Sequence, residues 1–389
     1  MKLRKIHLKG YKSIDGDVGQ SISFGDVTVL LGANGSGKSN IVSLLDMLQC
    51  LIKQELAQFV GKQGVSRLLF YGPKKTNAIT IETFFDDRSD NRYEVKLSFG
   101  LPDNLFISYE KVSFGQKSIP QEVLQAVHRQ RENGGQYAAG FHFLNSQNGE
   151  SGLVQDEEAT SKLIYDCLSD IRVYQFNDTS DTAKIKDRIY VDDAKYLRHD
   201  AGNLAAFLKM LKEHTAYTKY YERIIRHIQR VMPQFGDFDL ESIPGAENYV
   251  RLNWKDSSGT DYLFDPHQIS DGSLRFMALA TLLLQPPDLL PRFIVLDEPE
   301  LGLHPAAIAE LGGLARIAAQ NAQVLLATQS TRLVDEFLPE ELVIVEWDEQ
   351  QRCSIFKELG SERLNELRDW LVRYSLSELW EKNVLGGRP

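Results

Sequence analysis

Cysteine is scarce in this 389-residue chain, and long apolar runs are missing. The three cysteines, Cys50, Cys167 and Cys353, lie far apart without metal-binding spacing, so we interpret them as thiols in a reducing compartment. No run approaches the roughly 18 apolar residues that a membrane helix needs. The basic start, residues 1–5, leads into alternating polar and apolar residues and not into the apolar run of a signal peptide. We therefore expect a cytoplasmic protein that does not enter a membrane.

Positive charge is also in short supply, because 44 lysines and arginines face 54 acidic residues and give a net charge of -10. Such a surface repels nucleic acid unless a local basic patch prevails. One such patch is present at helical spacing, opposite an apolar stripe that includes Tyr221, Ile224 and Ile228. We call this patch the basic strip; its members are Lys219, Arg223, Arg226 and Arg230. The basic strip suggests contact with DNA or an acidic partner, although a solvated helix face is the ordinary alternative.

The order of apolar patterns predicts an α/β fold. Strands are expected at residues 2–8 and 27–31, then a helix from residue 38 to about residue 57, then an antiparallel meander at 78–84, 92–99 and 105–114. Short apolar runs at 293–296 and 324–327 are typical of buried parallel strands. We expect residues 1–115 and 245–389 to form one domain with a mixed sheet and an antiparallel β subdomain. Residues 116–244 are then an inserted, mainly helical lobe.

A glycine-rich segment follows the strand expected at 27–31 and precedes a helix. Its sequence, GANGSGKS at residues 32–39, matches the phosphate-binding loop pattern G-x-x-x-x-G-K-[ST] in the required strand-loop-helix context. Glycines let backbone N–H groups and the helix N-terminus point at phosphate oxygens. Lys38 is expected to bridge the β- and γ-phosphates of ATP, and Ser39 to bind Mg²⁺. The predicted nucleotide contacts are Asn34, Gly35, Ser36, Gly37, Lys38, Ser39 and Asn40.

Two adjacent acids, Asp297 and Glu298, end the apolar run at residues 293–296. Ligands of α/β sheets bind at this kind of strand end. We predict that Asp297 holds Mg²⁺ and that Glu298 polarises the attacking water. Upstream, Ser270 is a suitable N-cap for the apolar helix expected at residues 276–284, with Gly272 beside it.

Together these segments resemble the ABC-type ATPases, and more narrowly their SMC, RecF and OLD-like branch. The resemblance rests on the loop at 32–39, the segment at 270–275, the acid pair and the sequence ELGLHP at 300–305, in that order. The opening IHLKGYKSI at residues 6–14 is similar to the start of that branch. The whole chain, including its last residues YSLSELWEKNVLGGRP, also looks like a family of bacterial predicted ATPases.

The resemblance implies that Ser270 and Gly272 of one subunit contact the γ-phosphate held by another, so that ATP drives homodimerisation. It places Gln329 where the family often has a γ-phosphate-sensing histidine, and an amide cannot carry that charge. Gln175 stands where related sequences have a histidine. It is a candidate metal contact in a glutamine loop, and the alternative is an ordinary junction between strand and loop.

The expected function is an ATP-hydrolysing, dimerising switch for a DNA-related or phage-defence effector, a separate protein encoded nearby. A nuclease complex is the first alternative. OLD proteins add a C-terminal nuclease domain, whereas sixty residues follow Gln329 here, so a partner would have to supply that activity. A transporter subunit is the second alternative, which the 259 positions between Lys38 and Asp297 and the Ser-Asp-Gly signature disfavour.

Overall fold

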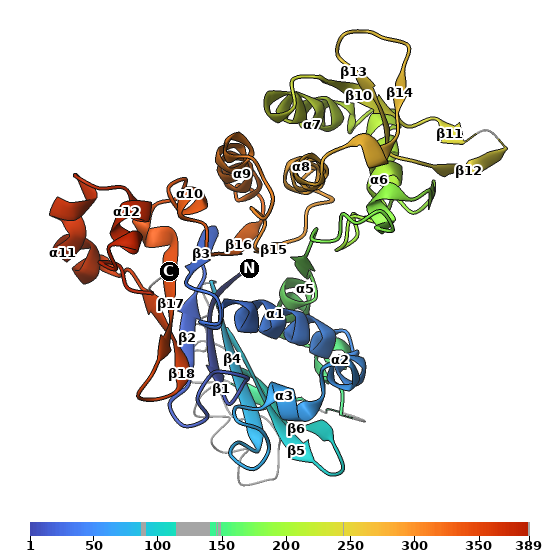
Figure 1. Ribbon diagram of the computed structural model, residues 1–389. Coiled ribbons are helices and arrows are strands. Elements are labelled where there is room, and N and C mark those ends of the chain that lie inside the picture. The colour runs from blue at the N-terminus through green and yellow to red at the C-terminus, as the bar shows by residue number, and fades with distance from the viewer. Residues whose placement is uncertain (87–90, 114–140, 145, 147–148, 244, 388–389) are drawn as a thin grey trace.

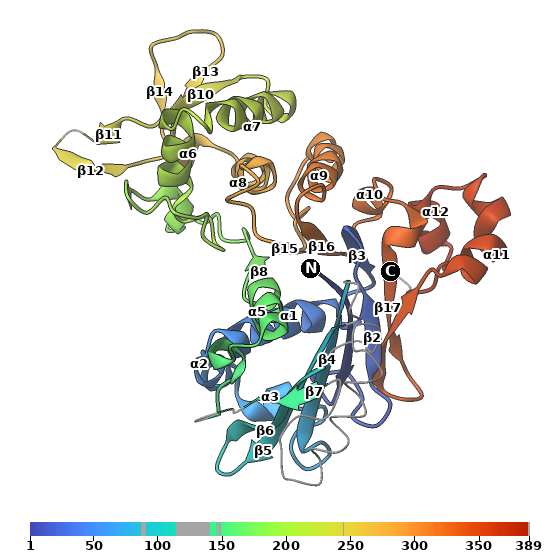
Figure 2. The same ribbon diagram turned by 180° about the vertical axis from the view of Figure 1, so that it is seen from behind.

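Two six-stranded sheets form the body of the protein, and a separate lobe extends from it (Figure 1). The computed structural model describes residues 1–86, 91–113, 141–144, 146, 149–243 and 245–387. Helices lie between the two sheets and over the far face of one of them, and Figure 2 shows the same arrangement from behind. The α/β fold expected from the sequence is therefore confirmed.

The first sheet has the strand order β18-β17-β3-β16-β15-β8, in which all neighbours are parallel except β17 and β18. Its two central strands β16 and β3 are fully buried, as a strand covered on both faces must be. The apolar runs at 293–296 and 324–327 are confirmed as neighbouring parallel strands. The strands are β3 (Val27–Leu31), β8 (Ile171–Tyr174), β15 (Phe293–Asp297), β16 (Gln323–Thr328), β17 (Leu342–Asp348) and β18 (Cys353–Glu358).

The second sheet is antiparallel and has the order β2-β1-β4-β5-β6-β7. Its strands alternate between buried and solvated residues, which the period-two pattern of the sequence predicts. The expected meander is confirmed as β4, β5 and β6. The strands are β1 (Lys2–Lys9), β2 (Gln20–Ser23), β4 (Ala78–Asp86), β5 (Arg92–Gly100), β6 (Asn104–Ser113) and β7 (Phe141–Phe143).

Two apolar cores lie on opposite faces of the parallel sheet. Helix α1 (Lys38–Ile52) packs in the core shared with the antiparallel sheet, and α8 (Asp271–Leu284) packs in the other core. Alternate residues of β3 enter different cores, Leu30 one and Leu31 the other. Helix α1 ends earlier than expected, because Gln54 adopts a left-handed backbone conformation before α2 begins.

The remaining helices surround this frame, with α9 beside α8 and α10 beside α12. They are α2 (Leu56–Gln63), α3 (Val65–Leu68), α5 (Ala159–Leu168), α9 (Pro305–Ala318), α10 (Thr331–Val334), α11 (Ser361–Leu371) and α12 (Leu376–Glu381). Short 3₁₀ helices are η3 (Leu153–Gln155), η4 (Lys184–Lys186), η5 (Pro266–Gln268) and η6 (Pro339–Glu341).

The lobe combines helices with small sheets, and its limits differ from the expected range of 116–244. Strand β8 falls inside that range, but it pairs with β15 and belongs to the parallel sheet. Strands β12, β13 and β14 lie beyond that range, and they pair with strands of the lobe. Periodicity cannot show which sheet a short strand joins. The lobe elements are α6 (Leu204–Glu213), α7 (Thr218–Val231), β9 (Ile189–Tyr190), β10 (Phe235–Asp239), β11 (Ser242–Ile243), β12 (Ala246–Val250), β13 (Asn253–Asp256) and β14 (Leu263–Phe264).

The helical stretch expected around residues 217–231 is confirmed as α7, with Tyr221, Ile224 and Ile228 buried. The basic strip on its other side is partly engaged, because Arg230 lies 3.1 Å from Glu310 of α9. Helix α7 also packs against α8. The lobe is thereby attached to the two helices that cover the parallel sheet. In the described residues, no helix is long and apolar enough to cross a bilayer.

We predict that Trp380→Ala lowers the free energy of unfolding by about 3–5 kcal/mol, the usual loss for a large buried aromatic residue. Trp380 is 1% exposed, and its indole N–H donates to the Gly387 carbonyl at 2.8 Å. Urea unfolding measures the change. The control is Trp370→Ala, at a side chain that is 44% exposed, for which we expect a loss below about 1 kcal/mol. Equal losses would contradict the packing described here.

Candidate functional site

The parallel register brings four loops to one edge of the sheet. Leu31 pairs with Thr328, and Ala327 pairs with Asp297. On the next strand Leu296 pairs with Tyr174. The glycine-rich loop, Gln329, the acid pair and Gln175 therefore follow neighbouring strands at their carboxyl ends, which is where α/β sheets bind ligands. Residues separated by more than 250 positions in the sequence meet at this edge.

The glycine-rich loop wraps around the Lys38 ammonium. Gly35 and Gly37 have φ values of 80° and 114°, and residues other than glycine rarely adopt such backbone conformations. Lys38 is 5% exposed and donates to the carbonyls of Gly32 and Ala33 at 2.7 and 3.0 Å. Helix α1 starts at Lys38, so its free N–H groups face the same space. The two glycines therefore supply the left-handed backbone on which this tight loop depends.

Side chains far away in the sequence hold this loop in place. The Ser354 hydroxyl on β18 donates to the Ser36 carbonyl at 2.6 Å and lies 2.6 Å from the Ser13 hydroxyl. Asn40, a predicted nucleotide contact, directs its side-chain amide to Ser13 at 2.6 Å. Sequence reasoning missed Ser354, because only pairing between distant strands brings it to the loop.

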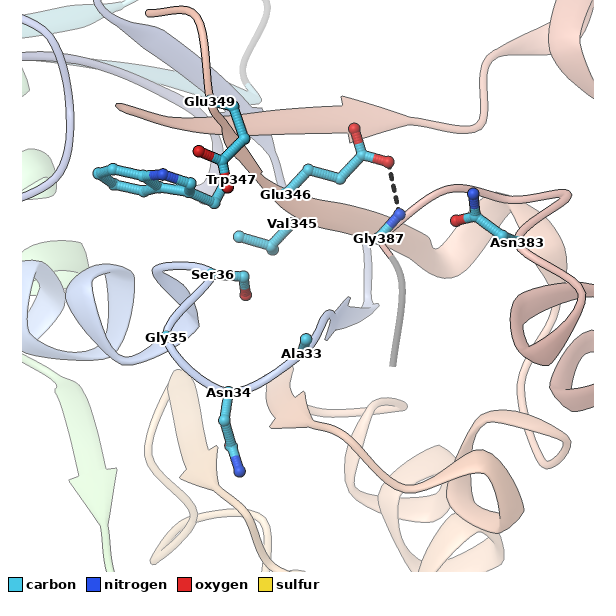
Figure 3. A pocket seen from close by; sticks show the side chains of 10 residues that line it. All are labelled: Ala33, Asn34, Gly35, Ser36, Val345, Glu346, Trp347, Glu349, Asn383 and Gly387. Carbon is cyan, nitrogen blue, oxygen red and sulfur yellow. Dashed lines mark hydrogen bonds between the residues drawn. The ribbon is translucent and has the colours of Figure 1, made fainter. Parts of the chain in front are cut away.

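A pocket separates the loop from the C-terminal part of the chain (Figure 3). Residues 33–36 form one wall, and Glu346 and Trp347 of β17 form another. The Gly387 N–H donates to the Glu346 carboxylate, so the C-terminal segment closes a third side. Asn34 is exposed, and its side chain points away from β17.

Burial perturbs both charged groups at the sheet edge. It lowers the pKa of Lys38, and the carboxylates Glu298, Asp297 and Glu300 oppose that change. It also raises the pKa of Asp297, with Glu298 acting in the same direction and Lys38 and a hydrogen bond from Ser39 opposing it. Such perturbed groups are typical of functional sites.

The donor set at this edge fits Mg²⁺. One oxygen of Asp297, Oδ1, is buried without a hydrogen-bond partner among the described residues. Ser39, Asp297 and Gln175 line a single cleft, which brings together a hydroxyl, a carboxylate and an amide oxygen. These are the hard ligands that Mg²⁺ prefers, and a bound cation would satisfy the unpaired oxygen. The sequence predicted these three residues separately, and the structure places all three on the walls of one cleft.

Glu298 and Gln329 follow β15 and β16 at the same edge of the sheet. Glu298 has a φ of 47°, uncommon for a residue with a side chain, and its N–H donates to the Ala327 carbonyl at 2.8 Å. This turn leaves the Glu298 side chain half-buried. Gln329, also half-buried, follows β16 between the loop and the acid pair.

Glu300 is a further acid that sequence reasoning did not assign. It is 7% exposed, and its carboxylate accepts a hydrogen bond from the Thr328 hydroxyl. Burial raises its pKa, which Thr328 opposes. The contact ties the loop after β15 to the end of β16, next to Gln329. In the sequence, the available signal for Glu300 was an acid three residues after the expected strand.

Ser270 and Gly272 start α8, on the face of the sheet opposite α1. Ser270 is confirmed as the N-cap, since its hydroxyl accepts from the Ser273 N–H at 3.2 Å. A Cβ on Gly272 would lie 2.3 Å from the Gly302 carbonyl, so only glycine allows this close approach. Arg275 donates to the Leu301 carbonyl at 2.6 Å and to the Asn177 carbonyl at 2.8 Å. The segment at 270–275 and the loop at 300–305 thus form one packed unit.

Comparison with known families agrees with this geometry. A family model described as "AAA domain, putative AbiEii toxin, Type IV TA system" matches residues 27–335. The chain belongs to this family. The match runs from β3 through the loop, the signature segment and the acid pair. No curated protein sequence matches the chain.

Solved structures share the fold. A crystal structure of the SMC head bound to the C-winged helix domain of ScpA is 16% identical and has a TM-score of 0.55, covering 94% of this chain and 100% of that one. An SMC head with an extended coiled coil, bound to the C-terminal domain of ScpA from Pyrococcus furiosus, is 15% identical and has a TM-score of 0.53, covering 96% and 100%. The family member therefore shares the fold of SMC head domains.

We predict that Asp297→Asn stabilises the metal-free protein more at pH 8 than at pH 5. A carboxyl whose pKa is raised by folding binds protons more readily in the folded protein. Its contribution to stability therefore falls as pH rises from its ordinary pKa through its raised pKa in the folded state. The neutral amide escapes this loss. Thermal unfolding at both pH values, without Mg²⁺, measures the difference. Mg²⁺ with ATP should then stabilise the wild type more than the variant, and the reverse order would contradict the cation assignment.

Proposed function

We propose that this family member binds Mg²⁺ and ATP at the sheet edge and hydrolyses ATP between two copies of the chain. The supporting observation is the convergence of Lys38, Asp297, Glu298 and Gln175 on one edge, with Ser270 and Gly272 carried by the opposite face. One copy therefore supplies the phosphate loop, and its partner supplies the signature helix start. A two-fold axis produces two such sites at once.

Each residue has a defined role in this proposal. The Lys38 ammonium and the N–H groups of residues 35–39 hold the β- and γ-phosphates. Ser39, Asp297 and Gln175 would hold Mg²⁺, which would supply positive charge beside the phosphates. Glu298 accepts a proton from the attacking water. Gln329 donates a hydrogen bond near the γ-phosphate without carrying charge. The partner's helix N-terminus, capped by Ser270, adds N–H donors.

The output of the cycle is regulatory in this proposal. ATP closes the dimer and hydrolysis reopens it, and the movement acts on a separate effector involved in DNA metabolism or phage defence. The lobe is the natural point of contact, because α7 packs directly on α8. Of the basic strip, Arg230 is engaged by Glu310, which leaves Lys219, Arg223 and Arg226 for contact with a polyanion.

We predict that Glu298→Gln lowers turnover by about 10²–10⁴-fold, the usual contribution of a general base, and traps an ATP-bound dimer. The amide keeps the shape of the side chain but cannot accept the proton. Light scattering with Mg²⁺ and ATP should show a doubled mass. Lys38→Ala is the control and should stay monomeric, because it loses nucleotide binding. Unchanged turnover in Glu298→Gln would rule out the base assignment.

A mixing experiment tests whether the site is shared. Ser270→Asp keeps an N-cap of equal quality but places a negative charge against the γ-phosphate of the other copy. Alone, Ser270→Asp and Lys38→Ala should both be inactive. Mixed in equal amounts, they should recover about a quarter of wild-type turnover, since half the dimers are mixed and each has one intact site. If both variants are folded and exchange subunits in the presence of ATP, a mixture without ATP turnover would contradict a shared site.

A further inference from the structure

The cleft that holds Ser39, Asp297 and Gln175 continues well beyond the cation position. We call it the α1 cleft; its walls are one side of α1, the end of β8 and residues 196–200. Ser39, Ser43, Asp46 and Lys53 line it at helical spacing, so it follows α1 for about 20 Å at about 1.5 Å per residue. This length exceeds what a bound γ-phosphate and its cation occupy. The far part of the cleft therefore has another use.

Two cations, Lys53 and Arg172, line the far end of the cleft. Lys53 is half-buried, and burial lowers its pKa, with Arg172 acting in the same direction. Among the described residues, no ion pair or hydrogen bond involves the Lys53 ammonium. The Arg172 guanidinium lies 5.0 Å from the Tyr196 ring centre, and its Nε is buried without a hydrogen bond, 3.8 Å from Asp170. Asp170 and Glu55 oppose the effect of Arg172 on Lys53, so the two cations share this end of the cleft with two acids. An ammonium and a guanidinium that line one cleft can still both donate to an anion.

The other charges of the cleft leave this position available. Lys184 pairs with Asp200 at 3.1 Å, and Arg198 pairs with Asp193. Asp46 lies among cations, although burial raises its pKa and they oppose that change: His199, Lys62, Lys12 and Lys53, in order of effect. Glu55 also lines the cleft and favours the charged form of Lys53. The acids near the far end are thus Asp46, Glu55 and Asp170, and they lie among several cations.

We infer that the α1 cleft binds inorganic phosphate as it leaves the hydrolytic centre. The inference rests on the proposed function, in which the partner's Ser270 helix covers the γ-phosphate from outside and phosphate must leave sideways. Ser43 and Gln49 line the route with hydroxyl and amide groups. Lys53 and Arg172 then stabilise the anion, since a guanidinium and an ammonium both bind phosphate through charge-assisted hydrogen bonds.

A binding measurement tests the site without hydrolysis. Inorganic phosphate is titrated into full-length Lys38→Ala protein, in which the phosphate loop lacks its cation, and binding is followed by calorimetry. Adding Lys53→Gln or Arg172→Gln should weaken binding by at least about tenfold, the loss expected for one charge-assisted hydrogen bond. Lys162→Gln, at an exposed residue of α5 outside the cleft, is the matched control and should leave binding unchanged. Equal affinity in all proteins would overturn the inference.

Transient kinetics tests the exit route. The variant Lys53→Gln is studied with Lys38 intact. The rate of ATP cleavage, measured by quenched flow, should stay as in the wild type. The rate of phosphate release, measured with a fluorescent phosphate sensor, should change by about tenfold. Release that follows cleavage as in the wild type would overturn the route. If AMP binds the Lys38→Ala cleft more tightly than phosphate while release is unaffected, the cleft belongs to a second phosphorylated ligand. A wild type that never cleaves ATP would defeat the proposed function, while the binding measurement would still decide the cleft.

Discussion

The parallel hydrogen-bond register of β8, β15, β16 and β3 is the constraint on which the rest of this structure depends. Parallel strands all end at the same edge, so the residues that follow them must meet there whatever their distance in sequence. A shift of one residue in any pairing would turn every side chain of that strand to the other face. The full burial of β3 and β16 opposes such a shift, and the functional edge therefore rests on the two cores.

Burial at this edge has an electrostatic consequence. Lys38 and Asp297 are both held away from water, and each favours its neutral form more than it would in solution. In the proposed function, a triphosphate with its cation supplies the charges that these groups lack. Ligand binding would then relieve the unfavourable burial of charge in the folded protein, which would couple affinity to a preformed geometry. Burial likewise lowers the pKa of Lys53 in the α1 cleft.

Contacts within the chain connect the edge to more distant parts. Glu300 joins the loop after β15 to Thr328, and the close approach of Gly272 to Gly302 joins that loop to the start of α8. Helix α8 contacts α7 of the lobe, and Arg230 of α7 reaches Glu310 of α9. Packed helices and one ion pair therefore connect α8 to the lobe.

The sequence by itself determined the loop at 32–39, the Ser270 cap, the acid pair and the buried parallel strands, because each depends on local pattern and backbone chemistry. It also determined the meander, whose alternation is local. Only the tertiary structure decided that β8 joins the parallel sheet and not the lobe, that Ser354 and Ser13 support the loop, and that Glu300 holds Thr328. These features depend on contacts between segments that are distant in the sequence. Local hydrophobic periodicity indicates a strand or a helix, but it does not indicate which distant segment that element contacts.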